Sequence, residues 1–308
     1  MSILKQKTLS KPIEFKGVGL HTGEKVKMKI FPSAPNSGII FKRIDLKNKN
    51  IIIPNVFNVV NATLCTTISN EFGAKVSTIE HLMASMYVLG LDNALIELNS
   101  QEVPIMDGSA KNFVDKMIET GFKISDTPLK FIKIEKSVSI KKDSKFIKID
   151  KSNITLDIDF EIKYKNLLIG DQQNKISVYQ DDMTDILNSR TFCLYEDIEK
   201  IKSIGLAKGG SLENAVVVKG KKILNEEGLR DKNEFVKHKI LDCLGDLMLS
   251  EHRIFGLIKT ERGGHQLTNS LLLKFFSDSS NWRFASYEKE EADRRKNYNY
   301  VRPVAVSA

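Results

Sequence analysis

The sequence predicts an α+β fold made of two similar layered domains, each a sheet with helices. With 308 residues the chain can form two hydrophobic cores, because single cores stop growing at about 250–300 residues. Strand-like runs precede helix-like stretches twice along the chain, which is typical of two α+β units. A cluster of turn-forming residues in "GFKISDTPLKF" separates the two series. We therefore expect domains over residues 1–125 and 126–275, followed by a polar tail over 276–308.

Each domain is expected to begin with strands and to end with helices. In the first, "KVKMKIFP" and "NALIELN" are strand-like, and helical patterns cover 78–89 and residues near 110–120. In the second, "FIKIEKSVSI", "SKFIKID" and "ITLDIDFEIKY" are strand-like, and helical patterns lie near 179–189 and 231–250. The stretch from Phe276 onward contains the charged run "EKEEADRRKNYNY" and is expected to be a mobile tail.

Composition argues against several classes of protein. Charged residues make up 28% and hydrophobic residues 41%, as in an ordinary globular protein. No apolar run reaches the roughly 18–20 residues of a transmembrane helix, and the first residues contain no apolar stretch of a secretory signal. The three cysteines are scattered without a CxxC pair. A disulfide framework is therefore not expected, a cysteine zinc site is excluded, and a cytoplasmic location is expected.

The net charge of +8 raises the alternative of nucleic-acid binding. The lysines, however, are spread over strands and helix surfaces, and no aromatic–basic platform or recognition-helix pattern is present. An anionic small-molecule substrate explains the surplus charge equally well. We therefore expect no nucleic-acid partner, and we infer no obligate protein partner.

A polar line crosses an otherwise apolar helix in "FVKHKILDCLGDLML". His238, Asp242 and Asp246 are spaced at i, i+4 and i+8, which places them on one side of three successive helical turns. Apolar side chains occupy almost every other direction, so this helix is expected to be packed on most sides. The question is what an imidazole and two carboxylates bind in such a place.

Two further histidines are candidates for the same site. His81 lies in the first turn of its helix, where the helix dipole favours the neutral imidazole that binds metals. Its neighbour Glu80 has a second explanation, because Ser77 and Glu80 fit the S-x-x-E capping box. His265 follows a double glycine in "KTERGGHQLTN", where it lies either at a cavity edge or in a surface loop.

Together, His81, His238 and Asp242 form a donor set of two nitrogens and one oxygen. Three protein ligands of this type leave a fourth position open, as in catalytic rather than structural zinc sites. The HxxxD spacing of His238 and Asp242 is weak evidence by itself, since many helices contain it by chance.

Six motifs carry a resemblance to a known family: "STIEHLMASMYVLGLDN", "PIMDGSA", "SRTF", "GLAKGGSLENAVVV", "EFVKHKILDCLGDL" and "GGHQLTN". From "GVGLHTGE" to about residue 274, the chain resembles the UDP-3-O-acyl-N-acetylglucosamine deacetylases, zinc enzymes of the committed step in lipid A synthesis. The resemblance implies hydrolysis of the N-acetyl group of a UDP-linked acylated glucosamine, with release of acetate. It also implies an active site between two layered domains and a cytoplasmic enzyme of a Gram-negative-type bacterium.

The resemblance further implies roles for the candidate residues. His81, His238 and Asp242 would hold zinc, with ferrous iron as the alternative metal in the cell. Zinc lowers the pKa of a bound water to about 7 and polarises the amide carbonyl. Glu80 would take the proton of that water as general base, and His265 would protonate the leaving amine as general acid.

The resemblance implies roles for four more residues. Asp246 would orient His265 and favour its charged form, and Thr191 would stabilise the oxyanion. Lys239 would contact the anionic nucleotide. Phe160 matches the aromatic residue that stacks on uracil, although relatives continue with a His-Pro pair where this chain has "IK".

An insert in the second domain of the family forms an apolar passage for the acyl chain of the substrate. The matching stretch here is "TFCLYEDIEKIKSIGLAKGGSLENAVVV". The alternative for each apolar residue in it is ordinary core packing. The candidate lining residues are Phe192, Ile198, Ala207, Leu212 and Val217.

Two other classes of protein fit the sequence less well. A fused deacetylase–dehydratase is disfavoured, because only about thirty residues follow the matching stretch. A non-catalytic metal-binding relative would be expected to lack Glu80 or His265, and both are present. The preferred acyl length, the metal used in the cell and the oligomeric state have no recognisable signature in the sequence.

Overall fold

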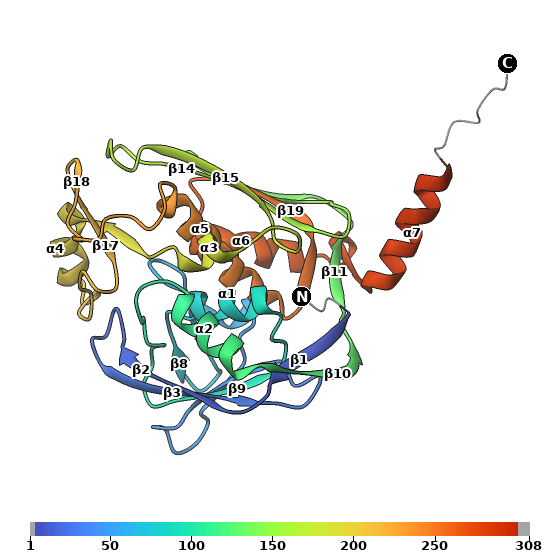
Figure 1. Ribbon diagram of the computed structural model, residues 1–308, viewed down its shortest axis with the longest axis horizontal. Helices are drawn as coiled ribbons and strands as arrows, with labels where there is room; N and C mark the ends of the chain where they lie inside the picture. The colour runs from blue at the N-terminus through green and yellow to red at the C-terminus, as the bar shows by residue number, and fades with distance from the viewer. Residues whose placement is uncertain (1–3, 301–308) are drawn as a thin grey trace.

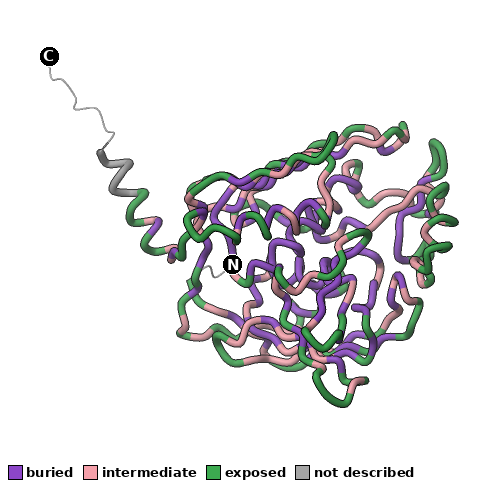
Figure 2. The backbone as a smooth tube through the Cα atoms, turned by 180° about the vertical axis from the view of Figure 1, so that it is seen from behind, coloured by how far each residue is buried: buried purple, intermediate pink, exposed green. Residues whose placement is uncertain are grey.

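The computed structural model describes residues 4–300, with residues 295–300 given by their backbone alone. Figure 1 shows two sheets on the outside of the molecule and helices between them. Figure 2 shows buried backbone concentrated in this middle layer and exposed backbone along the rims. One continuous hydrophobic cluster includes buried side chains from both halves of the chain. The predicted α+β fold is confirmed.

The outer sheet of the first half has five strands, in the order β2 (Ile13–Val18), β3 (Lys25–Pro32), β9 (Ala94–Leu98), β4 (Ile39–Arg43) and β5 (Ile51–Ile52). Only β4 and β9 run parallel. Exposed and buried residues alternate along the first six residues of β3, so its lysines face solvent and its apolar residues face the helices. The expected strands "KVKMKIFP" and "NALIELN" are confirmed as β3 and β9.

Two helices, α1 (Glu80–Leu89) and α2 (Lys111–Thr120), cover the inner face of this sheet (Figure 1). They confirm the helices expected over 78–89 and near 110–120. Strand β1 (Lys5–Leu9) pairs with β10 (Phe122–Pro128), so the expected break near residue 125 contains a strand of the first half. This half also contains the 3-10 helix η1 (Val56–Asn58) and a small sheet of β6 (Val59–Asn61), β7 (Thr67–Ser69) and β8 (Lys75–Val76).

The second outer sheet is organised around β19 (Arg253–Glu261), which pairs with β11, β13 and β14. Hydrogen bonds extend it from β13 to β12, from β14 to β15 and from β11 to β20. The expected strands of the second domain are therefore confirmed. The strands that match the expected runs are β11 (Phe131–Ile134), β12 (Val138–Lys142), β13 (Lys145–Asp150) and β14 (Leu156–Lys163). The strands β15 (Asp171–Ser177), β19 and β20 (Trp282–Ala285) were not expected.

Three helices of the second half complete the middle layer: α3 (Thr184–Asn188), α5 (Glu234–Leu247) and α6 (His265–Phe276). The pattern over 231–250 is confirmed as α5 and the 3-10 helix η2 (Met248–Ser250). The helix expected near 179–189 is shorter, because a hydrogen-bonded turn over 177–181 precedes it. Helix α6 was not predicted.

An insert between α3 and α5 forms a small unit at one end of the molecule (Figure 1). It contains β16 (Phe192–Leu194), α4 (Tyr195–Ser203), β17 (Val216–Lys219) and β18 (Lys222–Ile223). The three strands form a sheet of their own in the order β16-β17-β18.

The expectation of a mobile tail from Phe276 onward is wrong for its first part. After the 3-10 helix η3 (Ser279–Asn281), strand β20 pairs antiparallel with β11 inside the second sheet. The indole of Trp282 packs edge-on against the ring of Phe276 at 5.7 Å. Helix α7 (Tyr287–Tyr300) follows and projects from the body (Figure 1). The pairing could not be expected from composition, because β20 is held by tertiary contacts.

Residues 301–308 of the predicted tail lie outside the described part of the chain. Within the described range, none of the helices has the length and apolar character needed to cross a bilayer.

Candidate active site

The candidate site lies where α1 and α5 pack against each other between the two sheets. Every residue of α1 from Glu80 to Val88 is buried. Gly245 of α5 permits the close approach: a Cβ atom there would overlap the carbonyl oxygen of Glu80 and lie 2.7 Å from its carbonyl carbon. The missing side chain therefore brings the first turn of α1 against the helix that carries the polar line.

His81 from α1 and His238 and Asp242 from α5 have potential ligand atoms that all lie within 4.8 Å of one another. Nε2 of His238 and Nε2 of His81 are 3.4 and 3.5 Å from Oδ1 of Asp242. That oxygen is buried and has no hydrogen-bond partner within residues 4–300. An orphaned buried carboxylate oxygen is costly unless a cation compensates it. The residues therefore fit a divalent metal ion.

The surroundings of His238 favour the form that binds a metal. Its Nδ1 lies 3.0 Å from the carbonyl oxygen of Ser189, which suits a donating Nδ1 and leaves Nε2 for a ligand. Burial lowers the pKa of His238 to about 3, so the ring is neutral at ordinary pH. The sequence did not indicate Ser189 as a partner of His238, because the contact uses its backbone carbonyl and any residue type could provide it.

Lys239 binds the second oxygen of Asp242, with Nζ 2.7 Å from Oδ2. Burial by itself raises the pKa of Asp242, but His238 and Lys239 outweigh it and hold the pKa well below its usual value. Asp242 is therefore ionised. The contact makes Lys239 an orienting partner of this carboxylate, and its contact with a nucleotide stays a prediction.

The capping-box interpretation of Glu80 is wrong. Helix α1 begins at Glu80, and its N-cap residue, Ile79, makes no side-chain cap hydrogen bond. Ser77 instead pairs with Glu102 in an isolated β-bridge. The backbone of Thr78 is in the left-handed region, at φ +55°, which turns Ser77 away from the helix.

The carboxylate of Glu80 faces the site and is 3% exposed. Oε2 accepts a hydrogen bond from the backbone N–H of Thr66 at 3.1 Å, and Oε1 lies 3.9 Å from Nε2 of His265. Burial raises the pKa of Glu80. A buried carboxylate with a raised pKa, adjacent in sequence to a candidate metal ligand, has the properties expected of a general base.

His265 is the first residue of α6 and is 7% exposed, so the surface-loop alternative is wrong. Its Nδ1 lies 2.8 Å from Oδ2 of Asp246. Burial by itself lowers the pKa of His265, but Asp246 and Asp242 outweigh it and raise the pKa to about 10. The imidazole is therefore charged at neutral pH, as a general acid requires.

Thr66 also belongs to this site, although sequence reasoning missed it. Its hydroxyl donates to Oδ1 of Asp246 at 2.6 Å, while its backbone N–H binds Glu80. Thr66 is 14 residues from Glu80 and 180 from Asp246 in the chain. No local pattern therefore indicated it.

A cavity of about 350 Å³ lies between the insert and the loop that contains Leu20 and His21. The ring of Phe192 joins it to the site, because this ring is 6.2 Å from the ring of His238. Ala207 has a left-handed backbone, at φ +53°. The lining includes all five residues predicted for the acyl passage, namely Phe192, Ile198, Ala207, Leu212 and Val217.

Thr191 lines the same cavity and is fixed by its backbone. Its N–H donates to the carbonyl oxygen of Gly108 at 2.8 Å, and its own carbonyl accepts from the N–H of Val216 at 2.8 Å. Thr191 therefore lies between the "PIMDGSA" turn of the first half and β17 of the insert.

Phe160 does not have the exposure that its predicted role requires. Its side chain is 1% exposed and belongs to the hydrophobic core. A Cβ atom at Gly263 would lie 2.8 Å from Cζ of Phe160, so the ring is covered by backbone. The reason is that Phe160 points inward from β14, and no face of the ring is free to stack on uracil.

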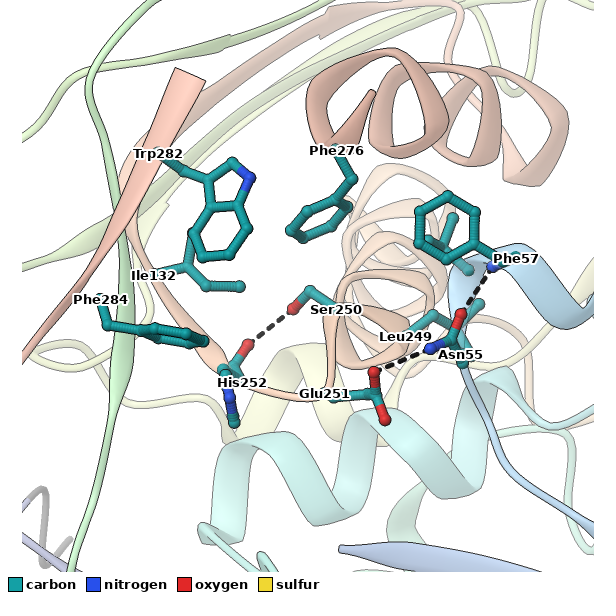
Figure 3. Close-up of a pocket in the computed structure, with 11 residues that line it drawn as sticks. Asn55, Phe57, Ile132, Leu249, Ser250, Glu251, His252, Phe276, Trp282 and Phe284 are labelled. Atoms are coloured by element: carbon teal, nitrogen blue, oxygen red, sulfur yellow. Dashed lines mark hydrogen bonds between the residues drawn. The ribbon is translucent and has the colours of Figure 1, made fainter. Parts of the chain in front are cut away.

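A second cavity, of about 290 Å³, lies beside η1, η2 and β20 (Figure 3). Aromatic side chains of Phe57, Phe276, Trp282 and Phe284 line it. His252 contributes a ring packed edge-on against Phe284 at 5.0 Å. None of the predicted site residues lines this cavity.

Comparison with known proteins identifies the family of the chain. The family described as UDP-3-O-acyl N-acetylglycosamine deacetylase matches residues 6–277. A UDP-3-O-acyl-N-acetylglucosamine deacetylase of Histophilus somni is 40% identical over 309 residues, 99% of each chain. The enzyme of the same name from Wigglesworthia glossinidia brevipalpis is 40% identical, and the match covers 97% of this chain and 99% of the relative. The one from Haemophilus ducreyi is 38% identical, and the match covers 93% of this chain and 94% of the relative. The chain therefore belongs to the UDP-3-O-acyl N-acetylglycosamine deacetylase family.

Proposed function

We propose that this protein hydrolyses the N-acetyl group of UDP-3-O-acyl-N-acetylglucosamine, the committed step of lipid A synthesis. Water adds to the acetyl carbonyl, the carbon–nitrogen bond breaks, and acetate and a free amine leave. The observation that carries the proposal is the convergence of Glu80, His265 and the donor set of His81, His238 and Asp242 in one buried place. The substrate comes from the names of the relatives.

The donor set would hold one divalent ion per chain. A metal bound there would supply Lewis-acid polarisation of the amide carbonyl and would acidify water. Two imidazole nitrogens and a carboxylate oxygen suit zinc, and imidazole also suits ferrous iron. We propose zinc, with ferrous iron as the alternative in the cell.

Two residues would move protons. Glu80 takes a proton from the attacking water at a carboxylate oxygen, and the backbone N–H of Thr66 keeps its other oxygen in place. His265 gives a proton from Nε2 to the leaving nitrogen, while Asp246 holds Nδ1. General acid–base catalysis of this kind typically contributes about 100- to 10,000-fold in rate.

The remaining predicted residues would bind or stabilise the substrate. Thr191 would donate its hydroxyl to the oxyanion, and Lys239 would interact with the negatively charged nucleotide part. The cavity lined by the insert would take the acyl chain, since each buried methylene contributes about 0.8 kcal/mol. Because the ring of Phe160 is covered, we propose no contact between it and uracil.

The test is product analysis with purified, zinc-loaded protein. Mass spectrometry of UDP-3-O-acyl-N-acetylglucosamine after incubation should reveal the free amine and acetate in equal amounts. Glu80→Gln and His265→Gln, which keep the side-chain size, should each lower kcat by about 100-fold or more.

Ser77→Ala is the matched control for Glu80→Gln, because it removes the other half of the rejected capping box. Its turnover should stay near that of the parent. A parent protein that binds zinc but produces no acetate from this substrate would refute the proposed reaction. If both Gln variants turn over substrate as fast as the parent, other residues must act as acid and base.

A further inference from the structure

We infer that Thr66 is a positioning residue that ties the proposed general base to the proposed general acid. It uses two different groups for this purpose: its backbone N–H binds Oε2 of Glu80, and its hydroxyl binds Oδ1 of Asp246. The inference rests on the proposed function, because it assigns Thr66 no chemistry of its own.

The contacts of Thr66 form a continuous chain through the site. Glu80 is bound to Thr66 at 3.1 Å, Thr66 to Asp246 at 2.6 Å, and Asp246 to Nδ1 of His265 at 2.8 Å. Thr66 lies immediately before β7 in the first half, whereas Asp246 and His265 belong to α5 and α6 of the second. The hydroxyl therefore forms one of the polar contacts that cross between the halves at the site.

Hydrogen-bond chemistry fixes the direction of this link. An ionised carboxylate only accepts, so the single proton of the Thr66 hydroxyl is donated to Asp246. Both oxygens of Asp246 are then occupied, one by Thr66 and one by His265. A carboxylate held at both ends cannot rotate freely, and the imidazole that it orients is held in turn.

Burial strengthens the expected effect of the hydrogen bond between the Thr66 hydroxyl and Asp246. Thr66 is 2% exposed, so water cannot readily replace its hydroxyl. A hydrogen bond to a charged group in such a place is worth a factor of about 10 to 100 in an equilibrium or a rate. That is the expected effect on kcat if the hydroxyl acts by orienting Asp246.

The neighbouring threonine provides a matched control. Thr67 is also buried, at 8% exposure, but its hydroxyl lies 3.8 Å from Sγ of Cys65 and belongs to no contact of the site. Successive side chains of an extended segment point to opposite sides. A merely structural role for buried threonines in this segment would affect both positions alike.

The experiment compares Thr66→Val, Thr66→Ser and Thr67→Val in the zinc-loaded protein. Valine keeps the shape and the backbone N–H but removes the hydroxyl, and serine keeps the hydroxyl. We expect Thr66→Val to lower kcat by about 10- to 100-fold with KM and zinc content nearly unchanged. Thr66→Ser should restore kcat to within a few-fold of the parent, and Thr67→Val should stay near it.

A double-mutant cycle decides whether Thr66 acts through Asp246. In an Asp246→Ala background, Thr66→Val should have almost no further effect on kcat, because the hydroxyl has lost its partner. Additive losses would overturn the inference. So would parental kcat in Thr66→Val, or a Thr66→Ser variant as slow as Thr66→Val. If Thr66→Val does not fold, Thr66→Ala tests the same loss with a smaller side chain.

A readout without turnover separates this inference from the proposed reaction. The imidazole ¹⁵N resonances of His265, assigned with His265→Gln, should shift in Thr66→Val and return in Thr66→Ser. A parent without deacetylase activity would refute the proposed function even if these shifts were observed. If the parent is active and the His265 resonances are the same in the parent, Thr66→Val and Thr66→Ser, the role of Thr66 is refuted and the proposed function is not.

Discussion

The proposed reactive centre on α1, α5 and α6 and the apolar cavity beside it are built in different ways. In the centre, the helices α1, α5 and α6 hold buried polar side chains, and Glu80, Asp242, Asp246 and His265 each contact at least one other polar group there. In the cavity wall, by contrast, helix α4 contains no buried residue. The cavity wall therefore includes a helix with no buried residue of its own, whereas the centre lies in the main hydrophobic cluster.

This difference corresponds to the proposed task of each region, which is proton transfer in the centre and binding of an alkyl chain in the cavity. Proton transfer requires acid and base within hydrogen-bond reach of the reacting atoms, held to within about 0.5 Å. An alkyl chain is bound by burial of apolar surface, which is non-directional. Changes in the centre should therefore remove activity, and changes in the cavity wall should alter the choice of substrate.

The largest effect is expected from His238→Ala, which removes one donor of the candidate metal set. Zinc affinity should fall by more than the roughly 10- to 100-fold that is typical of losing an outer-shell partner. Elemental analysis after dialysis, with circular dichroism to verify the fold, measures the loss. His252→Ala is the control, because His252 lies outside the candidate donor set and lines the second cavity (Figure 3). Unchanged zinc content in His238→Ala would reject the donor set.

A smaller but still severe effect is expected from Gly245→Ala, which changes no polar group. The added Cβ would collide with the backbone of Glu80 and separate α1 from α5. Overpacking of this kind costs about 1–3 kcal/mol of stability. A displacement of about 1 Å at the site lowers kcat by about 100-fold.

Gly256→Ala is a useful control for Gly245→Ala. Its Cβ would lie 2.8 Å from Cγ1 of Ile134, inside the second sheet and away from the site. It should lower the melting temperature while leaving kcat near the parental value. Equal kcat values for the two folded variants would mean that the helix contact does not control the geometry of the site.

Ala207→Phe should change substrate preference rather than abolish the reaction. The larger side chain would enter the cavity and hinder an acyl chain, so kcat/KM for a long-chain substrate should fall far more than for an analogue without the acyl group. Ala207→Gly is the control, because glycine suits the left-handed backbone and leaves the cavity open. An unchanged ratio of kcat/KM for the two substrates in Ala207→Phe would show that the acyl chain binds elsewhere.

The smallest effect on turnover is expected from removing the C-terminal segment, because none of its described residues belongs to the donor set or lines the apolar cavity. A chain ending at Ser286 loses α7 and the ion pairs of Glu290 with Lys133 and Arg283. Its kcat should remain within a few-fold of the parent, with a modest fall in melting temperature.

A chain ending at Phe276 also loses β20 and should be clearly less stable, since β11 then becomes an edge strand. Loss of most activity in a folded chain ending at Ser286 would show that this segment completes the substrate site.

Local patterns in the sequence were sufficient for the parts of the site that lie on one helix. The spacing of His238, Asp242 and Asp246 placed them on one side of α5, and the structure confirms that all three are buried there. The fold class also followed from local patterns. Apolar residues recur at every second position in the strands and at every third or fourth position in the helices, so the two kinds of element can be told apart along the chain. The grouping of His81 with this helix came from the type of the side chain and then from the family resemblance, not from spacing.

Local patterns failed where distant segments decide the outcome. Ser77 and Glu80 have the spacing of a capping box, but the left-handed turn at Thr78 and the contacts of Glu102 prevent it. The charged residues after Phe276 suggested a tail, but pairing with β11 makes β20 part of a sheet. In both cases tertiary contacts outweigh a local preference.

The sequence by itself determined which chemical groups are available and which of them share one face of a helix, because helical periodicity is a property of neighbouring residues. Only the tertiary structure decided how these groups meet. The approach of Gly245 to Glu80 and the hydrogen bond from the Thr66 hydroxyl to Asp246 join segments that are far apart in the chain. Such contacts depend on how two sheets pack around one helical layer, and no window of sequence contains both partners.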